Sequence, residues 1–132
     1  MFKLQMRIAY REVTVGNHVY YARYLDLLEI ARNEAFRQLG HSLLALQGRG
    51  LIFPVVECNL KYHGAARYDD LVEIETTLVD LRKVQFTMDY RVIRETETLL
   101  TATTRHAATD LDGQPVRIPS ELLAALEPHV KK

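Results

Sequence analysis

One stretch of helical periodicity, set among segments that alternate between apolar and polar residues, constrains the fold of this chain most. From Val19 onward apolar residues recur at steps of three and four, and this pattern continues to Leu39. Gly40 follows at the place where a left-handed residue commonly ends a helix. The spacing therefore predicts one long helix of about 20 residues.

The other regular segments alternate with a period of two, which is typical of strands that bury one face. One such run covers residues 3–10, and four more follow the helix at 53–62, 71–81, 84–94 and 99–108. The links between the last three runs are short, which favours antiparallel hairpins. A short terminal helix is expected after Pro119.

These elements predict an α+β fold in which an antiparallel sheet of about five strands wraps around one long central helix. A chain of 132 residues with 48% hydrophobic residues has the size of one domain, so residues 1–132 are expected to share one core. One helix leaves the outer face and an edge of the sheet uncovered. We therefore expect at least a homodimer.

Charge and composition exclude several classes of function. The 17 basic and 17 acidic residues cancel, so neither nucleic acid nor an anionic membrane is an expected partner. No apolar segment approaches the roughly 20 residues that cross a bilayer, and a cytoplasmic protein is expected. Cys58, His63 and His106 lack the close spacing of metal ligands, so no metal site is expected.

Two segments carry a resemblance to a known family. Residues 10–25 read YREVTVGNHVYYARYL and are followed by EIAR at 29–32, while ARYDD stands at 66–70 after the run 53–60. Both segments resemble the 4-hydroxybenzoyl-CoA thioesterase-like branch of the hotdog-fold acyl thioesterases. Together with the late segment DGQPVRIP at 112–119, the likeness spans nearly the whole chain.

The resemblance implies a hotdog fold and hydrolysis of an acyl thioester of coenzyme A or of an acyl-carrier protein. It also implies dimers whose sheets join edge to edge, often paired into tetramers, with two active sites at the subunit boundary. The coenzyme A thioester would be the substrate, and no further cofactor is expected. The length of the acyl pocket depends on which side chains of the second subunit close it, and Phe36, Leu39, Leu43 and Leu44 allow either a long or a short pocket.

Thioester hydrolysis needs a polarised carbonyl group and an activated water or nucleophile. The unpaired N–H groups at a helix N-terminus can hold a developing oxyanion. The resemblance places the backbone N–H of Tyr21 at the reacting carbonyl, with Tyr20 beside it.

The sequence departs from the family where the catalytic aspartate is expected, because Thr14 stands there. Gly16 stands one position early and Asn17 takes the usual place of the glycine. We hypothesise that Thr14 or Asn17 positions a water molecule, and that His18 accepts its proton, because imidazole exchanges protons near neutral pH. Glu12, at the place of the family's first acid, is expected to reach inward, to cap the loop or to face solvent.

Glu29 and Arg32 lie three residues apart and can share one helix face, with Arg32 among apolar positions. They are interpreted either as an ion pair that fixes the helix or as a ligand contact. Thioesterases of enediyne pathways resemble this chain in lacking the acid and in carrying an arginine at the place of Arg32. That resemblance implies hydrolysis without the acid.

Lys61 and Arg67 flank the ARYDD match and are the expected contacts for the phosphates of coenzyme A. Three functions stay open. A thioesterase leads, a non-hydrolytic acyl-thioester binding protein is the alternative, and a hotdog dehydratase ranks last because that group offers a histidine and an acid in a different motif.

Overall fold

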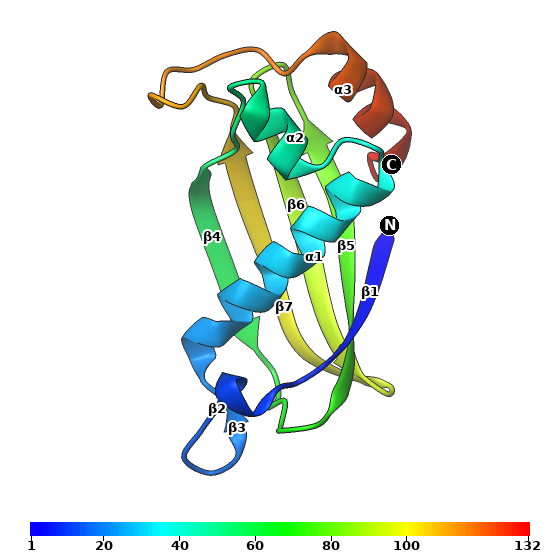
Figure 1. Ribbon diagram of the computed structural model, residues 1–132. Helices are drawn as coiled ribbons and strands as arrows, with labels where there is room; N and C mark the ends of the chain where they lie inside the picture. The colour runs from blue at the N-terminus through cyan, green and yellow to red at the C-terminus, as the bar shows by residue number, and fades with distance from the viewer.

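The computed structural model describes residues 1–132. A five-stranded antiparallel sheet in the order β1-β5-β6-β7-β4 forms its main layer (Figure 1). The strands are β1 Phe2–Arg7, β4 Val55–Tyr62, β5 Leu71–Leu81, β6 Gln85–Arg94 and β7 Glu97–Ala107. Each predicted run of alternation is confirmed as a strand.

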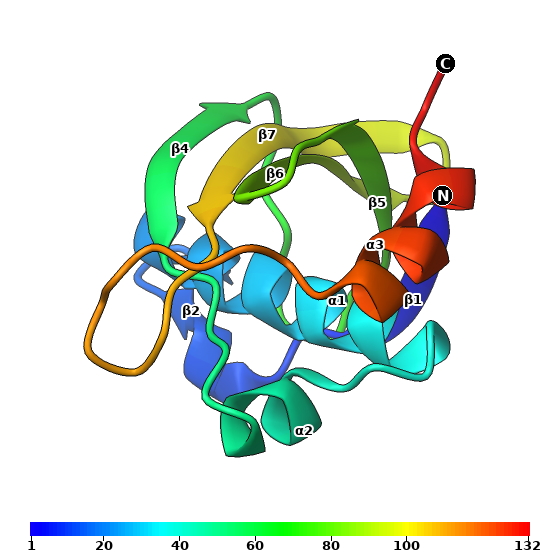
Figure 2. The same ribbon diagram turned by 90° about the horizontal axis from the view of Figure 1, so that it is seen from above.

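The central helix α1, Tyr24–Gln38, crosses the concave face of the sheet, which curves around it (Figure 2). A 3-10 turn, η2 at Tyr21–Arg23, precedes α1 without interruption, so the predicted helix exists with a tighter first turn. Gly40 has φ +79° directly after the helix, which confirms the predicted left-handed end.

The core lies between α1 and the concave face of the sheet. From the helix it receives Leu27, Leu28, Ala31 and Phe36, and from the sheet Ile74, Leu78, Phe86, Met88, Val92 and Leu100. A fully buried leucine or phenylalanine side chain contributes about 1.5–3 kcal/mol through the hydrophobic effect. This apolar contact fixes the helix axis on the sheet and thereby places both ends of α1.

Two shorter helices complete the domain. α2, Leu43–Gly48, lies on the side of α1 away from the sheet, and Ser42 caps its first turn by accepting a hydrogen bond from the N–H of Ala45. α3, Ser120–Leu126, continues into a 3-10 turn, η3 at Glu127–His129. α3 confirms the predicted terminal helix. No helix is both long and apolar enough to span a membrane.

The segment between β1 and α1 is more ordered than its irregular sequence indicates. After a 3-10 turn, η1 at Tyr10–Glu12, two short strands pair as an antiparallel ladder, β2 Val13–Thr14 and β3 His18–Val19. Gly16 and Asn17 turn the chain with positive φ values of 89° and 55°. This hairpin lies at the N-terminal end of α1 (Figure 1).

The strand β4 forms one edge of the sheet and pairs only with β7. Cys58, Leu60 and Tyr62 face the helix side, because they pair with Thr104, Ala102 and Leu100 of the inner face. Cys58 and Tyr62 nevertheless stay exposed, and so do Val55 and Val56. β4 therefore leaves both its edge and part of its inner face uncovered.

Candidate functional site

The first turn of the central helix offers backbone donors without acceptors. The N–H of Tyr20 donates to the carbonyl oxygen of Glu12 at 3.0 Å, and the N–H of Arg23 donates to that of Tyr20 at 2.8 Å. Between them, the N–H groups of Tyr21 and Ala22 have no acceptor in the protein, and no side chain caps the turn. The two amides can therefore hold a ligand oxygen.

Three hydrogen bonds hold this turn in place, and tyrosine hydroxyls take part in two of them. The Tyr62 hydroxyl on β4 donates to the carbonyl oxygen of Tyr21 at 2.9 Å. The buried Tyr24 hydroxyl accepts from the N–H of Ala66 at 3.0 Å, and Val19 N–H donates to the Ala66 carbonyl at 2.8 Å. The turn is thus tied to the edge strand and to the segment that begins the ARYDD match.

Thr14 and His18 lie directly opposite each other on the β2–β3 ladder, and both side chains are exposed. A Cβ atom on Gly16 would lie 3.2 Å from Cδ2 of His18, so the imidazole packs closely over this glycine. Glu12 is 7% exposed, and its carboxylate lies 3.5 Å from Nε of Arg11. No acidic side chain takes the place of the family aspartate on the ladder.

Asn17 and Arg67 connect the hairpin to the ARYDD turn. The Arg67 guanidinium donates to the carbonyl oxygen of Asn17 at 3.2 Å, and the side-chain oxygen of Asn17 accepts from the N–H of Tyr68 at 3.1 Å. Asp70 then accepts from Arg67 N–H and from Arg94. Both predicted residues therefore have structural partners at this end of the molecule.

Glu29 and Arg32 do not form the ion pair that was one of the two interpretations, which is a correction to that interpretation. Arg32 donates instead to the hydroxyl of Tyr90 on β6 at 3.1 Å, and Glu29 is exposed without a cationic partner. An exposed ion pair at this spacing contributes only about 0.3–0.5 kcal/mol. Such a pair would be too weak to hold the Arg32 guanidinium away from the sheet.

A directed hydrogen-bond chain continues from Arg32 through the core. Tyr90 and Thr104 hydroxyls lie 2.6 Å apart, and Thr104 lies 2.8 Å from Nε2 of His106. Nδ1 of His106 is 3.0 Å from the carbonyl oxygen of Phe53 and must donate there, because a carbonyl only accepts. Each hydroxyl therefore donates toward His106, and Tyr90 accepts from Arg32.

The imidazole of His106 is neutral at pH 7. Burial, reinforced by the positive charge of Arg32, lowers its pKa from 6.5 to about 4, although the bond to Phe53 opposes the shift. A neutral imidazole keeps Nε2 as an acceptor. Because buried His106 is neutral, the Thr104 hydroxyl can donate to it and the Tyr90 hydroxyl can donate to Thr104.

Arg32 and Glu29 lie far from the free amides. Arg32 follows Tyr21 by 11 residues, and a helical rise of 1.5 Å per residue separates them by about 16 Å. The two residues line a cavity of about 360 Å³ together with aromatic and aliphatic side chains of α1, α2 and β6. The predicted catalytic residues therefore divide between the N-terminus of α1 and its middle.

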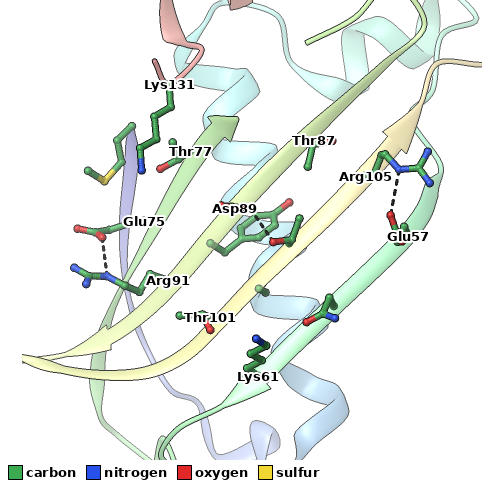
Figure 3. A pocket seen from close by; sticks show the side chains of 15 residues that line it. Glu57, Lys61, Glu75, Thr77, Thr87, Asp89, Arg91, Thr101, Arg105 and Lys131 are labelled. Carbon is green, nitrogen blue, oxygen red and sulfur yellow. Dashed lines mark hydrogen bonds and ion pairs between the residues drawn. The ribbon is translucent and has the colours of Figure 1, made fainter. Parts of the chain in front are cut away.

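Lys61 lies on the opposite face of β4 from Tyr62 and points to the convex side of the sheet (Figure 3). That side carries a polar hollow of about 810 Å³, crossed by the ion pairs Glu57–Arg105 and Glu75–Arg91. The structure does not bring Lys61 and Arg67 together. No group of three His, Cys, Asp or Glu side chains that could hold a metal ion is present.

Three residues of the site were missed at the level of the sequence: Tyr62, Tyr90 and Thr104. The alternation of residues 53–62 already places Tyr62 on the apolar face, so its position beside the helix could have been inferred. No local signal pairs Tyr90 or Thr104 with Arg32. Their chain depends on the register between β6 and β7.

Comparison with known proteins adds independent evidence. A family model described as the thioesterase-like superfamily matches residues 9–126. The acyl-CoA thioesterase YbgC of Haemophilus influenzae is 34% identical, covering 98% of this chain and 96% of that protein. A hypothetical protein from Thermus thermophilus superposes with a TM-score of 0.93 at 30% identity, covering 98% and 99% of the two chains. A probable thioesterase from Bartonella henselae gives 0.85 at 28% identity, covering 89% and 98%.

Proposed function

The chain belongs to the thioesterase-like superfamily, and on that premise we propose that it hydrolyses acyl thioesters of coenzyme A at the N-terminus of α1. The observation that carries this proposal is the pair of N–H groups of Tyr21 and Ala22, which have no acceptor in the protein. A relative that is 34% identical is named as an acyl-CoA thioesterase, which supports the same reaction.

In the proposed first step, the thioester carbonyl oxygen accepts a hydrogen bond from Tyr21 N–H. The partial positive charge at the start of the helix stabilises the oxyanion that develops when water attacks. The bond from Tyr62 to the carbonyl of Tyr21 holds this turn rigid, so the donors need little reorganisation during the reaction.

The attacking water would come from the side of the β2–β3 hairpin. Thr14 lies opposite His18 on this ladder, so a hydroxyl and an imidazole share one exposed face. We propose that Thr14 positions the water and that His18 accepts its proton as the carbon–oxygen bond forms and the thiolate leaves. Asn17 is a weaker candidate, because its side-chain oxygen already accepts from Tyr68.

The phosphates of coenzyme A require exposed basic side chains. Arg67 is exposed beside the hairpin, and we propose it as a contact for these phosphates. Lys61 points to the other face of the sheet, so it would serve only a ligand that passes around the edge strand. An acyl-carrier protein would present the same thioester arm.

We also propose a homodimer that forms through the uncovered edge of β4. An unpaired edge strand with exposed Val55, Val56 and Tyr62 presents both hydrogen-bonding groups and apolar surface. Pairing with a second copy would satisfy these groups and close the open side of the helix N-terminus. Two such dimers could form a homotetramer through the convex faces.

The proposal is tested by incubating the purified protein with short, medium and aryl acyl-CoAs and measuring released thiol. Hydrolysis above the enzyme-free rate is expected for at least one class of acyl group. Thioester binding without thiol release would contradict hydrolysis and favour a non-catalytic binding protein. A parallel assay uses the same acyl groups attached to acyl-carrier protein and compares the two thioester carriers.

A further inference from the structure

The cavity between α1, α2 and β6 has the composition of a binding site for an apolar group. Its volume is about 360 Å³, and seven of its 11 lining residues are hydrophobic. Phe36, Phe53 and Phe86 form an aromatic wall with ring centroids 5.1 to 5.7 Å apart. Leu43 and Leu44 of α2 also line it.

One cation in this apolar wall has no anionic partner. Arg32 lines the cavity and is half-buried, and none of the ion pairs of the protein includes it. Its single hydrogen bond runs to Tyr90, and its other N–H groups have no acceptor in the protein. A guanidinium in such surroundings gains from an added acceptor, because unpaired donors in a partly apolar site lose hydration.

The hydrogen bonds that link Tyr90, Thr104 and His106 fix the position of the Arg32 guanidinium. Tyr90 must accept from Arg32, because its own proton goes to Thr104, which in turn donates to neutral His106. Tyr90, Thr104 and His106 are all satisfied, so Arg32 is held by groups that have no alternative arrangement at neutral pH. Its remaining donors have no partner, on a residue that lines the cavity.

Glu29 lines the same cavity and selects the kind of acceptor that fits. A carboxylate ligand would gain from Arg32 but would be repelled by Glu29, and a methyl terminus would satisfy neither residue. A hydroxyl group accepts from the guanidinium and donates to the carboxylate at the same time. The pair therefore matches an uncharged hydroxyl oxygen.

The inner face of β4 carries residues that lie near both the proposed reaction site and Arg32. The Tyr62 hydroxyl contacts Tyr21, and burial raises the pKa of the Cys58 thiol, which the nearby charge of Arg32 opposes. Leu60 lies between Cys58 and Tyr62 on this face. A thioester carbonyl at Tyr21 would thus direct its acyl chain toward Arg32, about 16 Å away along the helix.

We propose that the cavity binds the distal end of the acyl group and that Arg32, with Glu29, selects acyl chains that carry a hydroxyl group there. This inference rests on the proposed function and assigns its substrate class. Arg32 is then a specificity residue, separate from the groups that polarise the carbonyl.

The test compares ω-hydroxyacyl-CoAs with the unsubstituted acyl-CoAs of equal length, from octanoyl to hexadecanoyl. At the length that reaches the cavity, kcat/KM is expected to favour the hydroxylated chain about tenfold or more, the value of one hydrogen bond to a charged group. Arg32→Met is expected to abolish the preference. Arg37→Met, on an exposed arginine of the same helix that pairs with Glu34, is expected to keep it.

Equal rates on both members of every pair, or a preference that survives in Arg32→Met, would overturn the inference while leaving hydrolysis intact. Absence of hydrolysis of all members would instead contradict the proposed function. Glu29→Gln supplies a second variant whose exposed position does not burden folding. It is expected to raise kcat/KM on the matching ω-carboxyacyl-CoA several-fold, and no gain there would count against the assignment of Glu29.

Discussion

The hydroxyl of Tyr62, at the end of the edge strand, donates a 2.9 Å hydrogen bond to the carbonyl oxygen of Tyr21 in the first turn of the central helix. The same peptide group carries the N–H of Ala22 on its other side. Because hydrogen bonds polarise one another through a peptide unit, this contact strengthens Ala22 N–H as a donor. The edge strand therefore affects both the position of the first helical turn and the donor strength of Ala22 N–H.

Tyr62→Phe removes this bond while keeping the aromatic contact with Tyr24. We expect kcat to fall a few-fold, because the first turn becomes less rigid and Ala22 N–H becomes a weaker donor. The change in unfolding free energy is expected to be about 1 kcal/mol. Tyr68→Phe is the matched control, since Tyr68 is equally exposed and its hydroxyl has no partner in the protein. A kcat unchanged in Tyr62→Phe would contradict this role.

Tyr21→Pro tests the proposed oxyanion donor directly, because proline has no N–H. Proline is well tolerated at the first position of a helix, and the preceding Tyr20 already has the extended backbone that proline requires, with ψ 133°. We expect kcat to fall by about 10²–10³-fold with little change in thermal stability. Tyr21→Ala, which keeps the N–H, should retain most of the activity. Similar rates in the two variants would exclude Tyr21 N–H as the donor.

Thr14 and His18 have separable roles in the proposed attack of water. Thr14→Ala is expected to lower kcat/KM about tenfold, and His18→Ala about 10²-fold, in the range of general-base catalysis. Thr14→Asp restores the carboxylate of the family pattern and is expected to raise the rate. His18→Ala with full activity, measured on the best acyl-CoA, would refute the proton-acceptor role.

The folded state is expected to lose stability in mild acid through His106. Its folded pKa of about 4 lies below the ordinary value of 6.5, so the unfolded chain binds a proton that the folded chain excludes. Stability from this group is complete above pH 6.5 and falls as the pH drops toward 4, by about 3 kcal/mol. The measurement is the unfolding free energy against pH for wild type and His106→Gln. Equal slopes between pH 6.5 and 4 would contradict the assignment.

The proposed dimer is tested on β4. Val56→Lys places a charge on the exposed apolar edge, where pairing with a second copy would bury it. Sedimentation at micromolar concentration is expected to give a dimer or a tetramer for wild type and a species of half that mass for this variant. Arg91→Lys on the convex face is the control. A wild-type monomer would overturn the proposal.

The sequence alone determined the elements of this protein and their order. The change of period at Val19, the alternation of the later runs and the glycine at position 40 are local signals, since each follows from the geometry of a single helix or strand. The resemblance of residues 10–25 to the hotdog-fold acyl thioesterases named Tyr21 as a donor, in agreement with helix geometry. The start of a helix leaves its first N–H groups unpaired whatever surrounds it.

Tertiary structure alone decided which partners those elements bring together. Spacing along the helix allowed Glu29 to pair with Arg32, but packing on the sheet turned Arg32 toward Tyr90. Strand register placed Tyr62 beside Tyr21, and it built the chain from Tyr90 to His106. These contacts join residues far apart in the chain, and their energies depend on the register and burial of whole elements. No local pattern encodes them.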